Sequence, residues 1–150
     1  MRKTTALALV LGLSASISLL PTVADARNDR LRLPLANVLN SPQARARLDM
    51  NVALYFGQQP YAAPLRRMGT FTANEKTNFF NKTDEEGCNW VFLSAVRKLQ
   101  EYARRQGGNA IVNVISVYKD QPFSSETEFE CGAGNVVGGV ALRGDVVSLK

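Results

Sequence analysis

The sequence predicts an α+β fold in which one long helix packs on a small, mostly antiparallel sheet within a single domain. The helix is indicated by residues 83–108, where an apolar stripe of helical period lies between a strong start signal and a strong stop signal. The sheet is indicated by shorter segments in which apolar and polar residues alternate with the period of two of a β-strand. A chain of 150 residues is long enough for one such domain.

Residues 1–26 have the features of a secretory signal peptide. Two basic residues precede an uncharged, mostly apolar run over residues 6–20, and the small-x-small pattern that ends at Ala26 is typical of a cleavage site. The run is shorter than the roughly 20 apolar residues of a transmembrane helix, and no Cys follows the cleavage site to carry a lipid. We therefore expect cleavage after Ala26, no membrane anchor, and a single periplasmic domain over residues 27–150.

The composition excludes several kinds of chemistry. The chain has no His, which excludes Ser-His-Asp and Cys-His nucleophile systems and His-ligated zinc sites. Two Cys are too few for a Cys-rich metal site. The formal net charge of +5 is mildly basic, and it is not the charge footprint of a nucleic-acid-binding protein. We therefore expect a protein that is not an enzyme, needs no cofactor and binds no nucleic acid.

The segment that follows the expected cleavage site contains short helices. Residues 27–32 are polar, and we expect a loose lead-in there. Residues 33–48 are expected to form one or two short helices, because Ser41 and Pro42 suit the N-cap and the first position of a helix.

Two strands are expected before the long helix. Residues 51–58 alternate in the manner of a strand, and a loop with two prolines follows. Residues 69–73 are expected to form a second strand that pairs with the first as a hairpin. Residues 74–82 are polar and rich in Asn, so we expect them to connect this hairpin to the long helix.

The long helix has clear signals at both ends. Thr83 and Glu86 suit the N-cap and N3 positions of a capping box, and Gly107 with Gly108 supplies the left-handed turn that ends many helices. Acidic residues in the first turn and basic residues in the last turn suit the helix dipole. The stripe that we expect to face the sheet contains Cys88, Val91, Phe92, Ala95, Leu99, Tyr102 and Ala103.

Further strands are expected after the helix. Residues 109–118 are apolar on both alternating faces, which is typical of a central strand buried on both sides. Asn113 is the polar residue of this strand, and we expect its amide to satisfy backbone groups in the core, with a place in a ligand pocket as the alternative. Residues 125–131 alternate cleanly, and residues 140–142 and 146–149 are expected to end the sheet.

Cys88 and Cys131 are the only thiols of the chain, and an even number of Cys in an exported protein indicates a disulfide. Both lie on faces that we expect to point inward. The bond would close a loop of about 44 residues, for which the chain-entropy model gives roughly 4 kcal/mol. Two free thiols are the alternative. A redox-active or metal-binding pair is disfavoured because the CxxC spacing is absent.

Glu126, Glu128 and Glu130 share one face of an expected strand. The interpretation that we prefer is a solvated acidic face. The alternative is a divalent-metal or basic-ligand site, since carboxylate oxygens suit hard cations. Same-face neighbours on a strand lie about 7 Å apart, which is too far for a compact metal cage without help from another strand.

The glycine-rich segment over residues 132–139 invites a nucleotide-binding interpretation. Gly134 and Gly139 have the spacing of a P-loop, but Val140 and Ala141 stand where that motif needs Lys and Ser or Thr. The residues that follow continue as a strand instead of opening a helix. We therefore expect these glycines to permit a bulge or a close approach to the helix.

The C-terminal half resembles a known family. The pattern LxxxAxxxGGNAIVNV from Leu99 to Val114, with CGA at Cys131 and GVAL at Gly139, resembles the YbjQ-like superfamily, which includes the RcsF-like envelope sensors. The resemblance covers residues 83–149, the expected core of the domain, and implies a helix across a mostly antiparallel sheet. In the RcsF-like branch disulfides link the helix region to later strands, which is a link of the same kind as the one expected here.

The whole chain is also similar to small exported proteobacterial proteins that often carry the label of an excinuclease ATPase subunit. The shared segments include YFG at Tyr55, DEEGC ending at Cys88 and FSS at Phe123. The missing P-loop Lys, the missing zinc-binding Cys sets and the export signal argue against that activity here. No ligand set for a family metal site is present either.

These observations together predict a non-enzymatic periplasmic protein, an envelope binding or sensing module stabilised by one disulfide. The expected partner is another envelope protein or an anionic envelope surface. The alternative is a small-ligand or divalent-metal-binding module that uses the face of Glu126, Glu128 and Glu130.

Overall fold

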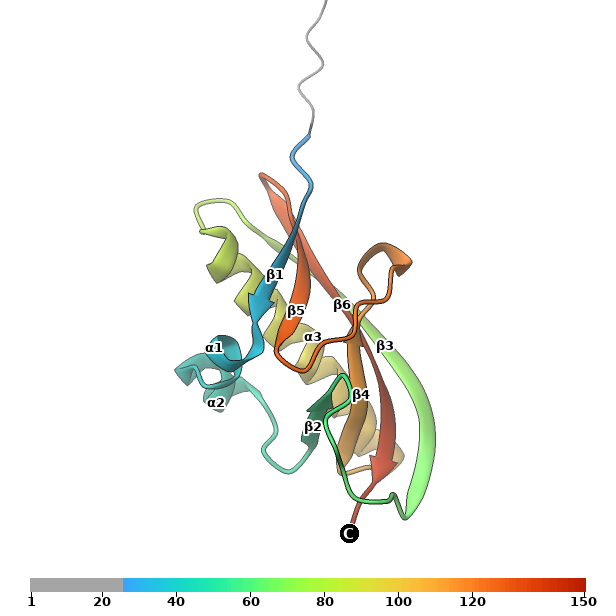
Figure 1. Ribbon diagram of the computed structural model, residues 1–150. Helices are drawn as coiled ribbons and strands as arrows, with labels where there is room; N and C mark the ends of the chain where they lie inside the picture. The colour runs from blue at the N-terminus through green and yellow to red at the C-terminus, as the bar shows by residue number, and fades with distance from the viewer. Residues whose placement is uncertain (1–25) are drawn as a thin grey trace, which may run out of the picture.

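A computed structural model describes residues 26–150, so the expected signal peptide lies outside the described residues except for Ala26. The longest helix, α3 (Asp84–Gln106), crosses one face of a mixed, six-stranded sheet (Figure 1). The other elements in chain order are β1 (Asp29–Pro34), α1 (Leu35–Leu39), α2 (Pro42–Arg47), β2 (Ala53–Phe56), β3 (Arg66–Asn78), β4 (Ala110–Ser116), the 3-10 turn η1 (Tyr118–Asp120), β5 (Glu128–Ala133) and β6 (Val137–Ser148). The predicted α+β class and the single domain are confirmed.

The last strand, β6, holds the two halves of the sheet together. Along one edge it pairs antiparallel with β3 over its whole length. Along the other edge it pairs first with β5 at Gly138 and Gly139, and then with β4 from Leu142 onward. The order of the sheet is therefore β1-β5-β6-β4-β2, with β3 on the far side of β6 (Figure 1). Among the strands of residues 26–150, only β2 and β4 pair in parallel, so the sheet is mostly antiparallel.

The expectation of a loose lead-in over residues 27–32 is wrong, because β1 begins at Asp29 and pairs antiparallel with β5. Leu31 and Leu33 pack against the core cluster, whereas Arg30 and Arg32, which alternate with them, point to the other face of the sheet. This short segment thus has the alternation of a β-strand, with leucine on one face and arginine on the other.

The expected hairpin between residues 51–58 and 69–73 is also wrong. β2 pairs in parallel with β4, and β3 pairs with β6. β3 runs on to Asn78, through the Asn-rich segment in which we expected no strand. Most of its side chains are exposed or half-buried, because it lies at an edge of the sheet, and an edge strand can be polar on both faces.

The core lies between α3 and the inner face of the sheet. The predicted stripe of α3 is buried there, apart from the half-buried Tyr102. The Phe92 ring lies 4.2 Å from the ring centroid of Phe129 on β5 and 6.1 Å from that of Phe56 on β2. The helix therefore contacts strands on both sides of β6.

A β-bulge in β4 changes which side chains point to the inner and outer faces of the sheet, compared with strict alternation. Between Val112 and Ile115 the register with β6 shifts, and Asn113 has a left-handed backbone with φ of 52°. The extra residue brings Ile111 and Val114 to the same inner face. Asn113 is exposed on the outer face, so its expected place among backbone groups of the core is wrong.

The predicted disulfide between Cys88 and Cys131 is present. Both residues are fully buried, and their Cα atoms lie 5.8 Å apart. The bond ties the second turn of α3 to the middle of β5, in the region where α3 packs on that strand.

Two aromatic rings explain why glycine is needed at two positions of the glycine-rich segment. A Cβ atom at Gly132 would overlap the Tyr118 ring, and one at Gly138 would overlap the Phe79 ring. Phe79 is buried and also lies against Gly87 of α3. These glycines therefore make room for two aromatic side chains.

Removal of the disulfide should lower the free energy of unfolding by about 2–4 kcal/mol, because the unfolded chain regains the freedom of the long loop. A Cys88→Ala/Cys131→Ala variant can be compared with the wild type by urea unfolding. The single variant Cys88→Ala serves as the control for packing, since it keeps one buried sulfur. Intact mass after export that shows two free thiols would contradict the pairing.

Gly138→Ala should lower the free energy of unfolding by about 1–3 kcal/mol, because the new methyl group displaces the buried Phe79 ring. Gly139→Ala is the matched control, since its Cβ would lie 3.2 Å from the Glu75 carbonyl oxygen and 3.4 Å from a flexible Lys76 carbon. Gly139→Ala should lower the free energy of unfolding by less than Gly138→Ala does. Equal losses in thermal or urea unfolding would show that the ring does not determine the need for Gly138.

Candidate functional site

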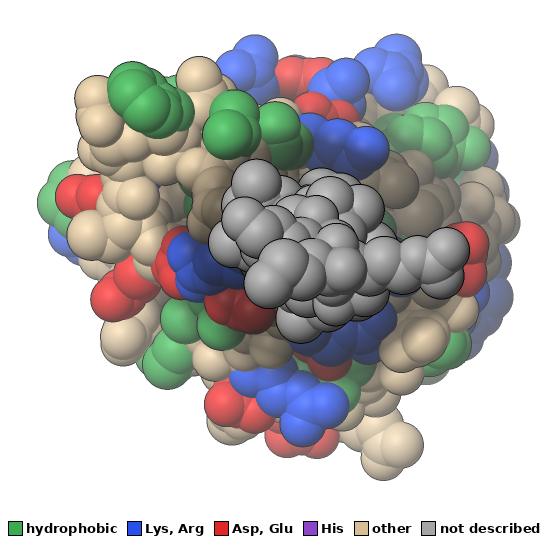
Figure 2. Space-filling view, turned by 90° about the horizontal axis from the view of Figure 1, so that it is seen from above, with side chains coloured by type: hydrophobic (Ala, Val, Ile, Leu, Met, Phe, Trp, Pro, Cys, Tyr) green, Lys and Arg blue, Asp and Glu red, His purple; other side chains and the backbone are tan. Residues whose placement is uncertain are grey.

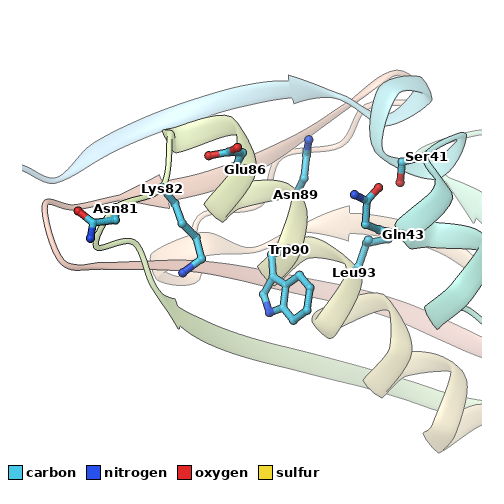
Figure 3. Close-up of a pocket in the computed structure, with 8 residues that line it drawn as sticks. All are labelled: Ser41, Gln43, Asn81, Lys82, Glu86, Asn89, Trp90 and Leu93. Atoms are coloured by element: carbon cyan, nitrogen blue, oxygen red, sulfur yellow. The ribbon is translucent and has the colours of Figure 1, made fainter.

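A hollow of about 410 Å³ lies where α2, the loop before α3 and the N-terminal half of α3 meet. Its volume is within the range of small-ligand sites. Figure 3 shows two loop residues at one end, two residues of the α2 region at the other, and side chains of α3 between them. The lining consists of Ser41, Gln43, Asn81, Lys82, Glu86, Asn89, Trp90 and Leu93. We call this site the Trp90 hollow.

Trp90 is the only Trp of the chain, and its side chain is half exposed, at 49%. It lies on the side of α3 opposite the buried stripe. The Arg47 guanidinium lies 4.0 Å from the centroid of the indole ring. Arg47 also donates hydrogen bonds to the Trp90 carbonyl oxygen (3.2 Å) and to Ser94 Oγ (2.8 Å). The indole is therefore held in place by a stacked cation that is itself anchored.

The Arg47 guanidinium is partly buried, and this burial affects its pKa. Partial desolvation, with a smaller contribution from the nearby charge of Arg97, lowers the pKa of Arg47 from its ordinary value. Desolvation also strengthens the attraction between a guanidinium and an aromatic face. Arg47 does not line the hollow itself, and it covers one face of a ring that remains half exposed.

Three amide side chains of the lining are not engaged by other residues of the part of the chain that the structure describes. Gln43, Asn81 and Asn89 make no side-chain hydrogen bond to any group of residues 26–150. Asn81 has a left-handed backbone with φ of 59°, a conformation that Asn tolerates better than most residues. Each amide can both donate and accept hydrogen bonds, so the hollow offers several neutral polar groups to a ligand.

The two charged groups of the hollow are of opposite sign, and each is bound by the backbone. Lys82 Nζ donates to the Asn78 carbonyl oxygen (2.9 Å). Glu86 Oε2 accepts a hydrogen bond from the Thr83 backbone N–H (2.8 Å), and Thr83 Oγ1 accepts one from the Glu86 N–H (3.1 Å). This capping box stabilises the first turn of α3. The hydrogen bond from the Thr83 backbone, with smaller contributions from the Thr83 side chain and from Lys82, lowers the pKa of Glu86.

At the other end of α3, Gly107 has the left-handed backbone of a C-cap, with φ of 78°. The Gly108 N–H donates to the Ala103 carbonyl oxygen (2.8 Å). Glu86 lines the Trp90 hollow and Thr83 caps the helix at that end. Gly107 and Gly108 lie at the far end of the helix, away from the hollow.

The acidic residues do not form the solvated face that we expected. Glu126 lies before β5, Glu128 begins it, and Glu130 is buried, with 1% of its surface exposed. The arginines of β1 explain the difference: Arg30 Nη1 and Arg32 Nε each lie 3.5 Å from a carboxylate oxygen of Glu130. Among the described residues no group of three or more His, Cys, Asp or Glu side chains is placed to hold a metal ion.

Asn113 lies on the outer face of the sheet, in a second and more open hollow. Its Nδ2 donates to Asp145 Oδ2 (2.9 Å), and Thr70 Oγ1 donates to the other carboxylate oxygen (2.6 Å). A second, longer contact joins Asn113 to the Tyr61 hydroxyl (3.4 Å). Asn113 therefore lies in a hollow, as the alternative prediction has it, and not in the core. Its amide already has hydrogen-bond partners there, Asp145 and Tyr61.

The sequence interpretation did not identify Gln43, Asn81, Asn89 or Trp90. One signal for Trp90 was present, because a large aromatic residue off the apolar stripe of a helix is expected at the surface. The amides lie on three separate segments, and only the folded chain brings them together.

The end of the domain at which β1 begins has mixed charge. Figure 2 shows basic and acidic side chains next to one another on this face. Arg27 forms ion pairs with Asp84 and Asp29, and the hydrogen bonds to these two carboxylates, first Asp84, raise the pKa of Arg27. Charge on this face therefore does not by itself favour an anionic partner.

No family model matches this sequence, and comparisons with curated proteins and with solved structures found no significant match. The resemblance to the YbjQ-like superfamily accordingly stays a prediction. Over residues 26–150, none of the helices combines the length and the apolar character that crossing a membrane requires.

The capping box should make the stability of the protein depend on acid pH. Because the pKa of Glu86 is lowered in the folded state, its contribution is complete above its ordinary value of 4.5 and is lost as the pH falls through the folded pKa. The wild type should therefore exceed Glu86→Ala in melting temperature at pH 6, and the difference should shrink toward pH 3.

Glu85→Ala is the control for this measurement, since it removes a carboxylate of the same turn that makes no side-chain hydrogen bond within residues 26–150. Its difference from the wild type should change less with pH. A Glu86→Ala difference that stays constant between pH 6 and pH 3 would contradict the role of the ionised cap.

Proposed function

We propose that the protein is a non-enzymatic binding module of the cell envelope, exported to the periplasm, and that the Trp90 hollow is its binding site. The observation that carries this proposal is the combination of a half-exposed indole, fixed by Arg47, with three unengaged amides around one hollow. Exposed Trp side chains with a fixed orientation are typical of recognition sites, because they offer a large contact area at little cost in entropy.

Two observations support export. The buried disulfide is consistent with an oxidising compartment, since disulfides are rare where thiols are kept reduced. Residues 1–26 have the charge and apolar pattern of a signal peptide. The resemblance to RcsF-like proteins, on the residues given above, favours an envelope sensing or binding role over a metabolic one.

The chemistry of the hollow favours binding over catalysis. Glu86 accepts a hydrogen bond in the capping box and Lys82 donates one to a backbone carbonyl oxygen, so both side chains have structural partners. The Ser41 hydroxyl donates to the Val38 carbonyl oxygen (2.7 Å) and accepts from the Ala44 N–H (3.1 Å). None of these groups forms the nucleophile–base pair that covalent catalysis needs.

Binding to envelope material should depend on Trp90. Protein purified after export can be mixed with the insoluble fraction of disrupted envelopes and its co-sedimentation measured over a range of concentrations. We expect Trp90→Ala to weaken binding by about tenfold or more, as loss of a central aromatic residue does at many recognition sites.

Phe80→Ala is the matched control, because Phe80 is 65% exposed in the loop before α3 and does not line the hollow. It should bind as the wild type does. Urea unfolding of both variants establishes that they are folded. Equal binding by the wild type and Trp90→Ala would refute the hollow as the binding site.

A further inference from the structure

We propose that the Trp90 hollow binds a neutral saccharide, with one sugar ring stacked on the indole and neighbouring rings held by the amides. This inference rests on the proposed function and names the class of its ligand. The argument depends on three properties of the lining: one flat aromatic surface, several neutral groups that both donate and accept, and no net charge.

The indole is the only substantial apolar surface of the hollow. Leu93, the other apolar residue of the lining, is 1% exposed and offers almost no surface to a ligand. Trp90 is held by the stacked Arg47 guanidinium. A single flat surface of this kind matches the flat C–H face of a sugar ring, whereas a lipid chain or an apolar drug-like molecule needs apolar walls on several sides.

The amides match the outer groups of the same ligand. Gln43, Asn81 and Asn89 each present an NH₂ donor and a carbonyl acceptor without a partner in residues 26–150. A sugar hydroxyl both donates and accepts, as does an acetamido group, so each can satisfy either end of an amide. Figure 3 places Asn81 at one end of the hollow and Gln43 at the other, with Asn89 and Trp90 between them, which suits more than one sugar ring.

The charges of the hollow disfavour other ligand classes. Lys82 and Glu86 are of opposite sign, so the lining has no net charge that would select a phosphate, a sulfate or an ammonium group. The hollow is built from helices and a loop, and none of its lining residues belongs to a strand. An extended peptide therefore finds no strand edge there with which to pair.

The single Trp gives a direct measurement of this site. We expect the intrinsic fluorescence of the wild type to change saturably on titration with a neutral trisaccharide, either the β-1,4-linked trimer of N-acetylglucosamine or cellotriose. The first probe has acetamido groups and the second has only hydroxyls, so their relative affinities identify which groups the amides prefer. Tri-alanine and a sulfated disaccharide test the peptide and the anionic classes.

The variant Gln43→Ala/Asn89→Ala keeps the fluorophore and removes two of the amides. Its affinity for the better trisaccharide should fall by about tenfold, which corresponds to the loss of two ordinary hydrogen bonds. Gln121→Ala is the matched control, since Gln121 is an exposed amide that does not line the hollow. It should bind as the wild type does.

The outcomes separate this inference from the proposed function. No fluorescence change with either trisaccharide, together with envelope binding that is lost in Trp90→Ala, would overturn the saccharide class and leave the binding module. Binding of tri-alanine or of the sulfated disaccharide in place of the neutral sugars would also overturn it. Unchanged affinity in Gln43→Ala/Asn89→Ala would refute the recognition by amides.

Discussion

The structure depends on the way α3 is fixed to the inner face of the sheet. Its apolar stripe is buried, and the disulfide between Cys88 and Cys131 joins the helix to β5. These two constraints set the rotation of the helix about its own axis, since a stripe can face only one way. The same rotation turns Trp90 outward, toward α2, where Arg47 stacks on it. The geometry of the Trp90 hollow is therefore a consequence of core packing on the opposite side of the helix.

The outer face of the sheet follows a different physical rule, because no α-helix of residues 26–150 covers it. Polar and charged side chains lie there beside a small apolar cluster of Ala110, Val112 and Val147, and several of them satisfy one another locally. Glu130 is buried between the arginines of β1, and burial of a carboxylate is tolerated only where opposite charges and hydrogen bonds replace its water. Asn113 and Asp145 are joined across the bulge of β4 in the same way. These pairs explain why the expected acidic face is absent and why we place the binding site elsewhere.

The fold class could be predicted from the sequence, because the signals that indicate it most strongly are local. The capping box at Thr83 and the left-handed turn at Gly107 each involve only a few consecutive residues and need no tertiary context. The pairing of strands is not local. β2 and β3 were expected to pair because they are neighbours in sequence, yet each pairs with a strand that follows α3. The candidate site was missed for a related reason, since its amides come from segments that are far apart in the chain.

The sequence by itself determined the ends of the long helix, the face that it buries and which two cysteines could pair, because capping, periodicity and a count of two thiols are local or compositional signals. Only the tertiary structure decided which strands lie side by side, where the carboxylate of Glu130 finds its partners, and that Trp90, Gln43 and Asn81 line one hollow. These outcomes depend on contacts between distant segments, and such contacts form only when the buried face of α3 has been placed on the sheet.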